Sequence, residues 1–135
     1  KMEINNIIKF LGIDTFLGKS LYGGTIIGLL DDSILILASK DTETRLNWTE
    51  AIEYCSILNS NGYTDWRLPS KDELYELYKN KDVLDSKEAF IEFTYWSSSE
   101  FSSTYARIQT FTNGSQGSNG KTYAYYIRAV RSIKL

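Results

Sequence analysis

Residues Tyr95–Arg131 read YWSSSEFSSTYARIQTFTNGSQGSNGKTYAYYIRAVR, and this stretch differs in composition from the chain before it. More than half of residues 95–126 are Tyr, Ser, Gly or Asn, and only Glu100, Arg107 and Lys121 among them are charged. Tyr offers rigid aromatic area at low entropic cost, while Ser, Gly and Asn offer adaptable hydrogen bonding, which is the mixture found in antibody paratopes. The stretch is therefore predicted to form a binding surface.

Alternation of side chains predicts strands within this stretch. Residues 105–112 place two sets of side chains on opposite faces, Ala106 and Ile108 against Tyr105, Arg107 and Gln109. Phe111 falls on the second set, so a bulge or the end of the strand is expected near it. Residues 113–120 are rich in Gly and Ser and predict a loop. Residues 121–133 are apolar on both faces, which is typical of a strand near the middle of a sheet, and Trp96 is expected to be a buried anchor.

Two helices are predicted before this stretch, because two capping boxes mark where they begin. The first N-cap is Asn47, with Glu50 three residues later, and the second is Ser70, followed by Glu73. The first helix is expected to end near Asn61–Gly62, since Gly commonly follows the last turn of a helix.

The N-terminal part of the chain predicts a hairpin and a further helix. Two apolar, β-branched runs, Thr25–Leu30 and Ile34–Ala38, are separated by Asp31–Ser33, which predicts a β-hairpin. Residues 4–11 place apolar side chains at helical spacing before Gly12, which predicts a short amphipathic helix. The whole pattern is that of an α+β protein, with two helices packed on antiparallel sheets and a long, loop-rich C-terminal region.

Length and charge restrict the classes of function. The 135 residues are the size of one ordinary domain. A net charge of −2 without a basic cluster argues against a nucleic-acid partner held through its phosphates. No apolar run reaches the roughly 18 residues of a membrane span, so neither membrane insertion nor a signal peptide is expected. We expect an N-terminal amphipathic segment at residues 1–20 and one ligand-binding domain at residues 21–135.

The inventory of side chains argues against several kinds of catalysis. The chain has no histidine, so a serine-hydrolase triad and a zinc site built from Cys and His cannot be assembled. Cys55 lies on the apolar stripe of a predicted helix and is expected in the core, where burial would raise its pKa. Gly120–Thr122 resembles the end of a phosphate-binding loop, but Ser115 occupies the position of the required glycine. We therefore expect no catalytic residue, no cofactor and no metal.

Two groups of charged residues admit a second interpretation. Asp72 and Glu76 are four residues apart and could act as acid and base, but negative charge near a helix N-terminus is explained by the helix dipole. Arginines of the chain could bind an anionic ligand or could form ion pairs with Asp65 and with the acidic start of the second helix. We favour the ion pairs for these arginines, which are Arg67, Arg128 and Arg131.

A multipart pattern extends over residues 24–133: Trp48, Ala51, Tyr54–Cys55, Leu58, Gly62, Asp65–Pro69, Glu73–Leu74, Tyr95–Ser99, Phe111, Gly114 and Arg128–Arg131. This pattern resembles the C-terminal domain family of bacterial collagen-like adhesins. The resemblance implies a C-type-lectin-like fold, in the branch shared with formylglycine-generating enzymes. The C-terminal stretch is also similar to the variable proteins of diversity-generating retroelements, in which an error-prone reverse transcriptase replaces adenine-rich codons.

The resemblance divides the C-terminal stretch into a frame and a diversified set. The implied frame residues are Trp96, Ala106, Phe111, Gly114, Lys121, Tyr126, Arg128 and Arg131. The implied ligand-binding, variable residues are Phe101, Ser102, Thr104, Tyr105, Arg107, Gln109, Thr112, Ser115, Gln116, Ser118, Asn119, Thr122 and Tyr123. Tyr105, Arg107 and Tyr123 are the expected anchors, because Tyr and Arg are enriched at binding hot spots.

The sequence departs from the enzymes and the sugar-binding lectins of this fold. Formylglycine-generating enzymes act through a pair of cysteines, whereas this chain has Cys55 alone, and the calcium-ligand motifs of C-type lectins are missing. The expected function is a non-enzymatic display domain that binds a protein or cell-surface ligand, is exposed on a virion or cell surface, and is a monomer or a fibre-associated oligomer. The alternatives are an oligomerisation domain of a viral tail or cell-surface fibre, and a carboxylate-based hydrolase.

Overall fold

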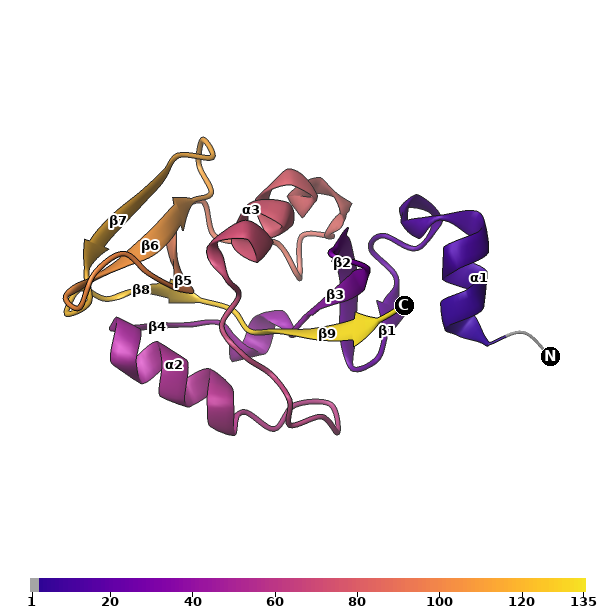
Figure 1. Cartoon of the computed structure of the whole chain (residues 1–135), viewed down its shortest axis with the longest axis horizontal. Helices are drawn as coiled ribbons and strands as arrows, with labels where there is room; N and C mark the ends of the chain where they lie inside the picture. Colours follow the sequence, from indigo (N-terminus) through magenta and orange to yellow (C-terminus); the bar gives the residue numbers. More distant parts are fainter. Residues whose placement is uncertain (1–2) are drawn as a thin grey trace.

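The last third of the chain adds strands to both sheets of the protein, and the helices lie against those sheets (Figure 1). The structure is a computed structural model that describes residues 3–135. Its helices are α1 Ile4–Leu11, α2 Trp48–Ile57 and α3 Lys71–Lys79, with 3-10 turns at Ile13–Thr15, Lys40–Thr42 and Lys81–Val83. Its strands are β1 Ser20–Leu21, β2 Gly24–Leu30, β3 Ser33–Leu37, β4 Thr44–Leu46, β5 Thr94–Glu100, β6 Tyr105–Thr110, β7 Gln116–Gly120, β8 Tyr125–Ile127 and β9 Val130–Lys134.

The strands form two sheets that lie next to each other along the long axis of the molecule (Figure 1). One sheet has the order β1-β2-β3-β9 and the other the order β4-β8-β5-β6-β7. Neighbouring strands are antiparallel except β5 and β8, which pair in parallel through Tyr95 and Tyr126. Helix α3 contacts β2 of the first sheet and both β5 and β6 of the second, so it bridges the two. The predicted α+β class is confirmed.

The predicted hairpin forms as β2 and β3. Asp31 and Asp32 both have positive φ angles, 51° and 60°, which is the requirement of the tight hairpin turn whose twist matches that of the strands. Short polar side chains tolerate this conformation better than other non-glycine residues. Both carboxylates are exposed at the turn, as expected of solvated turn formers.

Both predicted capping boxes are present. The Asn47 and Ser70 side chains accept hydrogen bonds from the Glu50 and Glu73 amides, and each glutamate accepts one from the amide of its N-cap residue. The predicted end of the first helix is wrong: α2 stops at Ile57, because Leu58 leaves the helix with extended backbone and packs on the core. The Asn61–Gly62 pair forms instead a separate turn between Ser60 and Tyr63, with φ angles of 52° and 85°.

The C-terminal stretch differs from the prediction in two places. The loop expected at residues 113–120 is shorter, because Gln116–Gly120 pairs with β6 as strand β7. The single strand expected at residues 121–133 is divided into β8 and β9 by Arg128–Ala129, so the chain passes from one sheet to the other. Strand β8 lies between β4 and β5 as expected of an interior strand, whereas β9 is an edge strand of its sheet.

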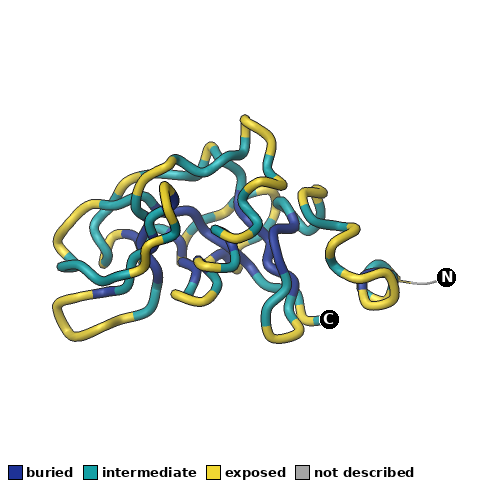
Figure 2. Tube along the Cα trace, turned by 90° about the horizontal axis from the view of Figure 1, so that it is seen from above, coloured by how far each residue is buried: buried dark blue, intermediate teal, exposed yellow. Residues whose placement is uncertain are grey.

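Two apolar clusters hold the sheets and helices together. The first contains Trp66, Trp96 and Cys55, and the second contains Tyr95 and Phe111 beneath α3. Trp96 is fully buried, which confirms its predicted role as an anchor. Figure 2 shows the buried backbone running through the centre, with exposed segments on the peripheral loops.

The N-terminal segment contacts the rest of the protein through Ile8, which is buried in the first cluster, and through β1. Helix α1 lies at the end of the molecule beyond the four-stranded sheet (Figure 1). Of the predicted segment 1–20, residues 1 and 2 lie outside the described residues. The boundary between residues 20 and 21 falls inside β1 and stays a prediction.

Candidate functional site

The residues implied to bind ligand lie on the loop after β5, on the β6–β7 hairpin and on the turn after β7. Nine positions are exposed: Phe101, Ser102, Thr104, Tyr105, Thr112, Ser115, Gln116, Thr122 and Tyr123. Arg107, Ser118 and Asn119 are half-buried, and Gln109 is buried. Most of the set is therefore accessible to a partner, as a binding surface requires.

One group of these residues is contiguous, and we call it the candidate surface. The register pairs Tyr105 with Gly120 and Arg107 with Ser118, and the Arg107 guanidinium lies 4.5 Å from the centroid of the Phe101 ring. The ring of Tyr123 lies next to Gly120, so that a Cβ there would approach it to 3.4 Å. The candidate surface consists of Phe101, Ser102, Thr104, Tyr105, Arg107, Ser118, Thr122 and Tyr123.

A second group lies toward the other end of the hairpin, where Gln116 pairs with Gln109, about 13 Å from Tyr105 along β6. Thr112 donates a hydrogen bond to the Glu92 carbonyl, and the Ser115 amide donates one to the Asn113 side chain. Gln116 follows as the first residue of β7 and is exposed. The structure thus places Thr112 and Ser115 away from the candidate surface, whereas Gln116 lies two residues from Ser118 on β7.

Gln109 is buried, although the sequence analysis placed it among the implied ligand-binding residues. Only 1% of it is exposed, and its Nε2 donates weak hydrogen bonds to the carbonyls of Thr110 and Ser115, at 3.3 and 3.4 Å. Alternation places Gln109 on the same face as Tyr105, but at this end of β6 the face is covered by α3 and by the cluster around Tyr95. Sequence periodicity identifies a face and cannot show where a helix covers it.

Asn119 lies on the other face of β7, opposite Ala106. Its Nδ2 donates to the Tyr125 hydroxyl, and the Tyr125 ring packs edge-on against Trp96 with their centroids 5.0 Å apart. Asn119 therefore packs on the core face of the sheet and does not belong to the candidate surface.

Lys121, one of the implied frame residues, fixes the loops that carry the candidate surface. Its Nζ lies 2.7 Å from the Glu100 carboxylate and donates to the Ser103 carbonyl at 2.9 Å. The same ammonium lies 4.4 Å from the centroid of the Trp48 ring, a cation–π contact. Its backbone amide donates to the Thr104 carbonyl. One side chain thus joins the end of β5, the following loop and the start of α2.

Ser97 and Trp48 form a second support that the sequence did not identify. Ser97 is fully buried, and its hydroxyl donates to the Arg107 carbonyl at 2.9 Å and accepts from the Ser99 amide. Trp48 Nε1 donates to the Ser97 carbonyl. The Ser97 hydroxyl therefore holds the Arg107 backbone in place, and no local pattern signals such a long-range bond.

The arginines form ion pairs, as predicted. Arg67 binds the Glu73 carboxylate with two nitrogens, at 2.5 and 2.7 Å, and Arg131 binds Asp65 in the same manner, at 2.6 and 3.1 Å. These side chains tie β9 and the segment before α3 together and are not free to hold an anionic ligand.

Arg128 pairs with acids that the sequence did not identify. Its side chain is 1% exposed and donates to the Ala38 carbonyl, to the Glu88 carbonyl and, at 3.0 Å, to the Glu88 carboxylate. The Glu43 carboxylate lies 4.0 Å away. Burial lowers the pKa of the guanidinium, although both carboxylates oppose this effect. Arg128 is thus a structural ion at the junction of the sheets.

The acids considered as a catalytic pair have separate partners. Asp72 is exposed and lies 3.9 Å from Lys71, while Glu76 pairs with Lys79 at 2.9 Å and accepts a hydrogen bond from Asn80. Within residues 3–135 no three His, Cys, Asp or Glu side chains are placed to hold a metal ion. These contacts favour the helix-dipole interpretation.

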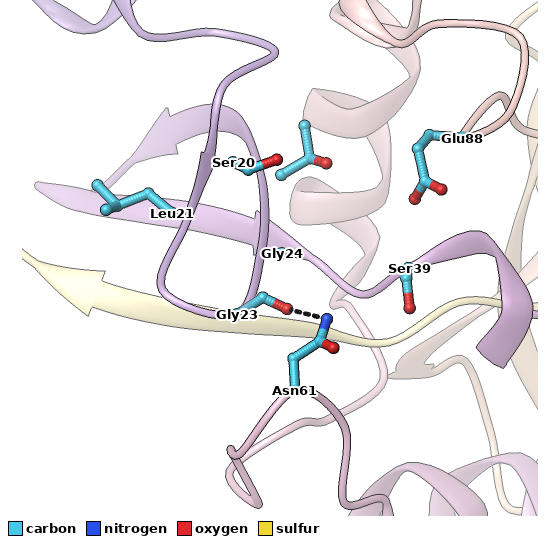
Figure 3. Close-up of a pocket in the computed structure, with 8 residues that line it drawn as sticks. Ser20, Leu21, Gly23, Gly24, Ser39, Asn61 and Glu88 are labelled. Carbon is cyan, nitrogen blue, oxygen red and sulfur yellow. Dashed lines mark hydrogen bonds between the residues drawn. The ribbon is translucent and has the colours of Figure 1, made fainter.

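A hollow of about 530 Å³ lies on the four-stranded sheet and contains none of the implied ligand-binding residues. Figure 3 shows Glu88 and Ser39 on one side of it and Gly23 and Asn61 on another, with Asn61 Nδ2 donating to the Gly23 carbonyl at 2.8 Å. The only charged side chain of the hollow is Glu88, which is engaged with Arg128 and with the Lys40 amide. This hollow therefore adds no chemistry to the candidate surface.

No helix among residues 3–135 is long and apolar enough to cross a membrane.

Two comparisons with known proteins bear on the family of the chain. No curated protein matches the chain. A family model described as the Lcl C-terminal domain matches residues 31–131. This family is the C-type-lectin-fold variable-protein domain of diversity-generating retroelements, a binding domain that is not known as an enzyme. The two-sheet α+β structure and the extent of the match lead to one conclusion: the chain belongs to the Lcl C-terminal domain family.

Proposed function

We propose that this chain is a non-enzymatic display domain that binds a protein or cell-surface ligand through the candidate surface and is exposed on a virion or cell surface. The observation that carries the proposal is the accessibility of three large aromatic side chains on one supported surface. Phe101, Tyr105 and Tyr123 are 57%, 45% and 59% exposed. Tyr and Arg are enriched at binding hot spots, and the Arg107 guanidinium lies against the Phe101 ring.

The support beneath this surface favours a role in which side chains change and the backbone does not. Lys121 and Ser97 hold the loop and strand by contacts with the backbone of Thr104, Ser103 and Arg107. Such contacts do not depend on the side chains at those positions. Substitutions of Thr104 and Arg107 therefore leave these contacts intact, which is what diversification of this surface needs, whereas the Ser102 hydroxyl itself accepts hydrogen bonds from the Thr104 and Tyr105 amides.

Codon-level comparison tests diversification directly. The gene would be compared with a template copy near it and with the same gene from sister isolates. We expect differences to be confined to adenines of the template and to fall in the codons of the implied variable residues. Differences spread evenly over all four bases, or equally frequent in the codons of Trp96 and Lys121, would contradict the proposal.

Binding to cells tests the role of the surface. The labelled chain would be applied to a panel of cell types, and the cells that adsorb it would be used with the variant Tyr105→Ala/Arg107→Ala/Tyr123→Ala. We expect adsorption to fall at least about tenfold, since each hot-spot truncation costs about 2 kcal/mol or more. The matched control is Tyr75→Ala, because Tyr75 is 42% exposed on α3 and outside the candidate surface. Equal loss in the control, or none in the triple variant, would refute this role.

A second candidate function, assembly of a fibre or tail, is favoured by the apolar side chains of α1. Phe10 is 82% exposed and Leu11 54% exposed on this helix. Exposed apolar side chains of this size occur at subunit interfaces. Sedimentation analysis separates the two functions: assembly requires an oligomer that Phe10→Glu converts to monomer, and a strict monomer excludes assembly.

A further inference from the structure

A second hollow, of about 240 Å³, lies at the β4 edge of the five-stranded sheet. It is lined by Arg45 of β4, Phe93 and Thr94 at the start of β5, and Tyr125 and Tyr126 of β8. None of these residues belongs to the implied variable set. The hollow is smaller than the roughly 300–1,000 Å³ of sites for drug-sized ligands, so its size suits a single ring.

Two aromatic rings that stack on each other line this hollow. Phe93 is 63% exposed, and its ring is nearly parallel to that of Tyr126, with an angle of 14° and centroids 6.3 Å apart. The Tyr126 ring also contacts Tyr95 of the core, which fixes its position. Phe93 is a large apolar side chain that stays exposed next to a fixed ring. Covering it with a planar apolar group removes apolar surface from water and is therefore favourable.

Arg45 supplies a positive charge without a partner. Its guanidinium carbon lies 5.7 Å from the centroid of the Tyr126 ring, and its one hydrogen bond, to the Ala124 carbonyl, is long at 3.4 Å. Within residues 3–135 Arg45 forms no salt bridge, whereas Arg67 and Arg131 each grip a carboxylate with two nitrogens. The remaining donors of Arg45 match the geometry of a carboxylate.

The charge of the hollow selects an anion. Its lining contains no acidic side chain, so the Arg45 charge is not compensated there. We propose that this hollow binds small aryl carboxylates, with the ring against Phe93 and Tyr126 and the carboxylate on Arg45. The proposal does not depend on the proposed function, because the site shares no residue with the candidate surface.

Titration of the intact chain with benzoate tests the proposal, followed by the backbone amide signals in NMR spectra. We expect shifts centred on Arg45, Phe93 and Thr94. Benzyl alcohol has the ring and lacks the charge, so it should bind about tenfold more weakly or worse, since hydrogen bonds to charged groups are the stronger ones. Equal affinity for both compounds, or shifts centred elsewhere, would overturn the proposal.

Two substitutions test whether Arg45 is responsible for benzoate binding. Arg45→Gln should weaken benzoate binding about tenfold or more and leave benzyl alcohol binding unchanged. The matched control is Arg107→Gln, since Arg107 also lies on an aromatic ring and forms no salt bridge within the described chain. If Arg107→Gln weakens benzoate binding as much as Arg45→Gln does, the site is not this hollow. Amide spectra that are unchanged away from each substitution verify that the variant is folded. If the Arg107 variant alone loses cell adsorption, that result tests the candidate surface and leaves the proposal for the hollow unaffected.

Discussion

The Cys55 thiol lies on the core side of α2 and is fully buried. Burial raises its pKa to about 12, so the thiolate is scarce at neutral pH. We expect Cys55 to resist a thiol reagent at pH 8 in the native protein and to react fully in denaturant. Absorbance of the released reagent group checks this. Rapid reaction of the native protein, at a rate independent of denaturant, would contradict the burial.

Glu73 couples stability to pH. Burial alone raises the pKa of this carboxyl, but the hydrogen bonds from Arg67 and from the Ser70 amide outweigh burial and hold the pKa below its ordinary value. A lowered pKa in the folded state stabilises the protein above the unfolded value of about 4.3, and this stability is lost as pH falls through the folded value.

Glu73→Gln should therefore lower the free energy of unfolding at pH 7 by about 1–3 kcal/mol and make its decrease below about pH 4 shallower. Urea denaturation at a series of pH values measures both effects. The control is Asp72→Asn. This side chain is 78% exposed and interacts mainly with the helix dipole, so its substitution should lower stability by at most about 1 kcal/mol. Parallel pH profiles for Glu73→Gln and the unsubstituted protein would show that the pair contributes no pH dependence.

At the scale of elements, α2 depends on its first turn. Asn47 caps the helix, and the next amide, of Trp48, donates to the Lys121 carbonyl after β7. The first turn of α2 thus contains both the cap of the helix and its backbone contact with Lys121, the residue that fixes the loops of the candidate surface. Local signals predicted this helix start well, because a capping box requires only residues three apart.

Asn47→Ala should lower the free energy of unfolding by about 0.5–2 kcal/mol, since it leaves the Glu50 amide without its partner. Thermal and urea unfolding provide the measurement. Asn47→Asp restores the acceptor and should recover most of the loss. Equal destabilisation by both substitutions would indicate that the cap is not the cause.

Strand β7 shows where local signals fail. Gln116–Gly120 has the Gly- and Ser-rich composition of a loop and low intrinsic strand propensity. It becomes a strand because β6 lies beside it and offers five consecutive residue pairs. The same composition gives β7 small side chains, Ser118 and Gly120, opposite Arg107 and Tyr105, and they leave Tyr105 exposed and Arg107 half-buried.

At the scale of the whole molecule, stability and binding reside in different residues. Trp96 is fully buried between the sheet and α2, whereas Tyr105 and Tyr123 extend into solvent. Tyr105→Ala and Tyr123→Ala should each change the free energy of unfolding by less than about 0.5 kcal/mol, and Trp96→Ala should lower it by about 3–5 kcal/mol. Urea denaturation of the three variants checks this; a loss above about 2 kcal/mol from either tyrosine would contradict a free surface.

The sequence by itself determined the α+β class, both capped helix starts, the first hairpin and the buried positions of Trp96 and Cys55. These depend on periodicity and on contacts between residues close in sequence. Its pattern also identified most of the exposed residues around Tyr105, through a resemblance that the family match supports.

Only the tertiary structure decided how far along β6 the face that carries Tyr105 stays exposed. Gln109 and Tyr105 share a face, yet α3 covers one and leaves the other in solvent. The split of the last strand at Arg128 and the partners of that arginine likewise come from segments some 40 to 90 residues away. Burial and pairing of this kind are set by which elements meet in space, and that information is not present in the local spacing of the residues.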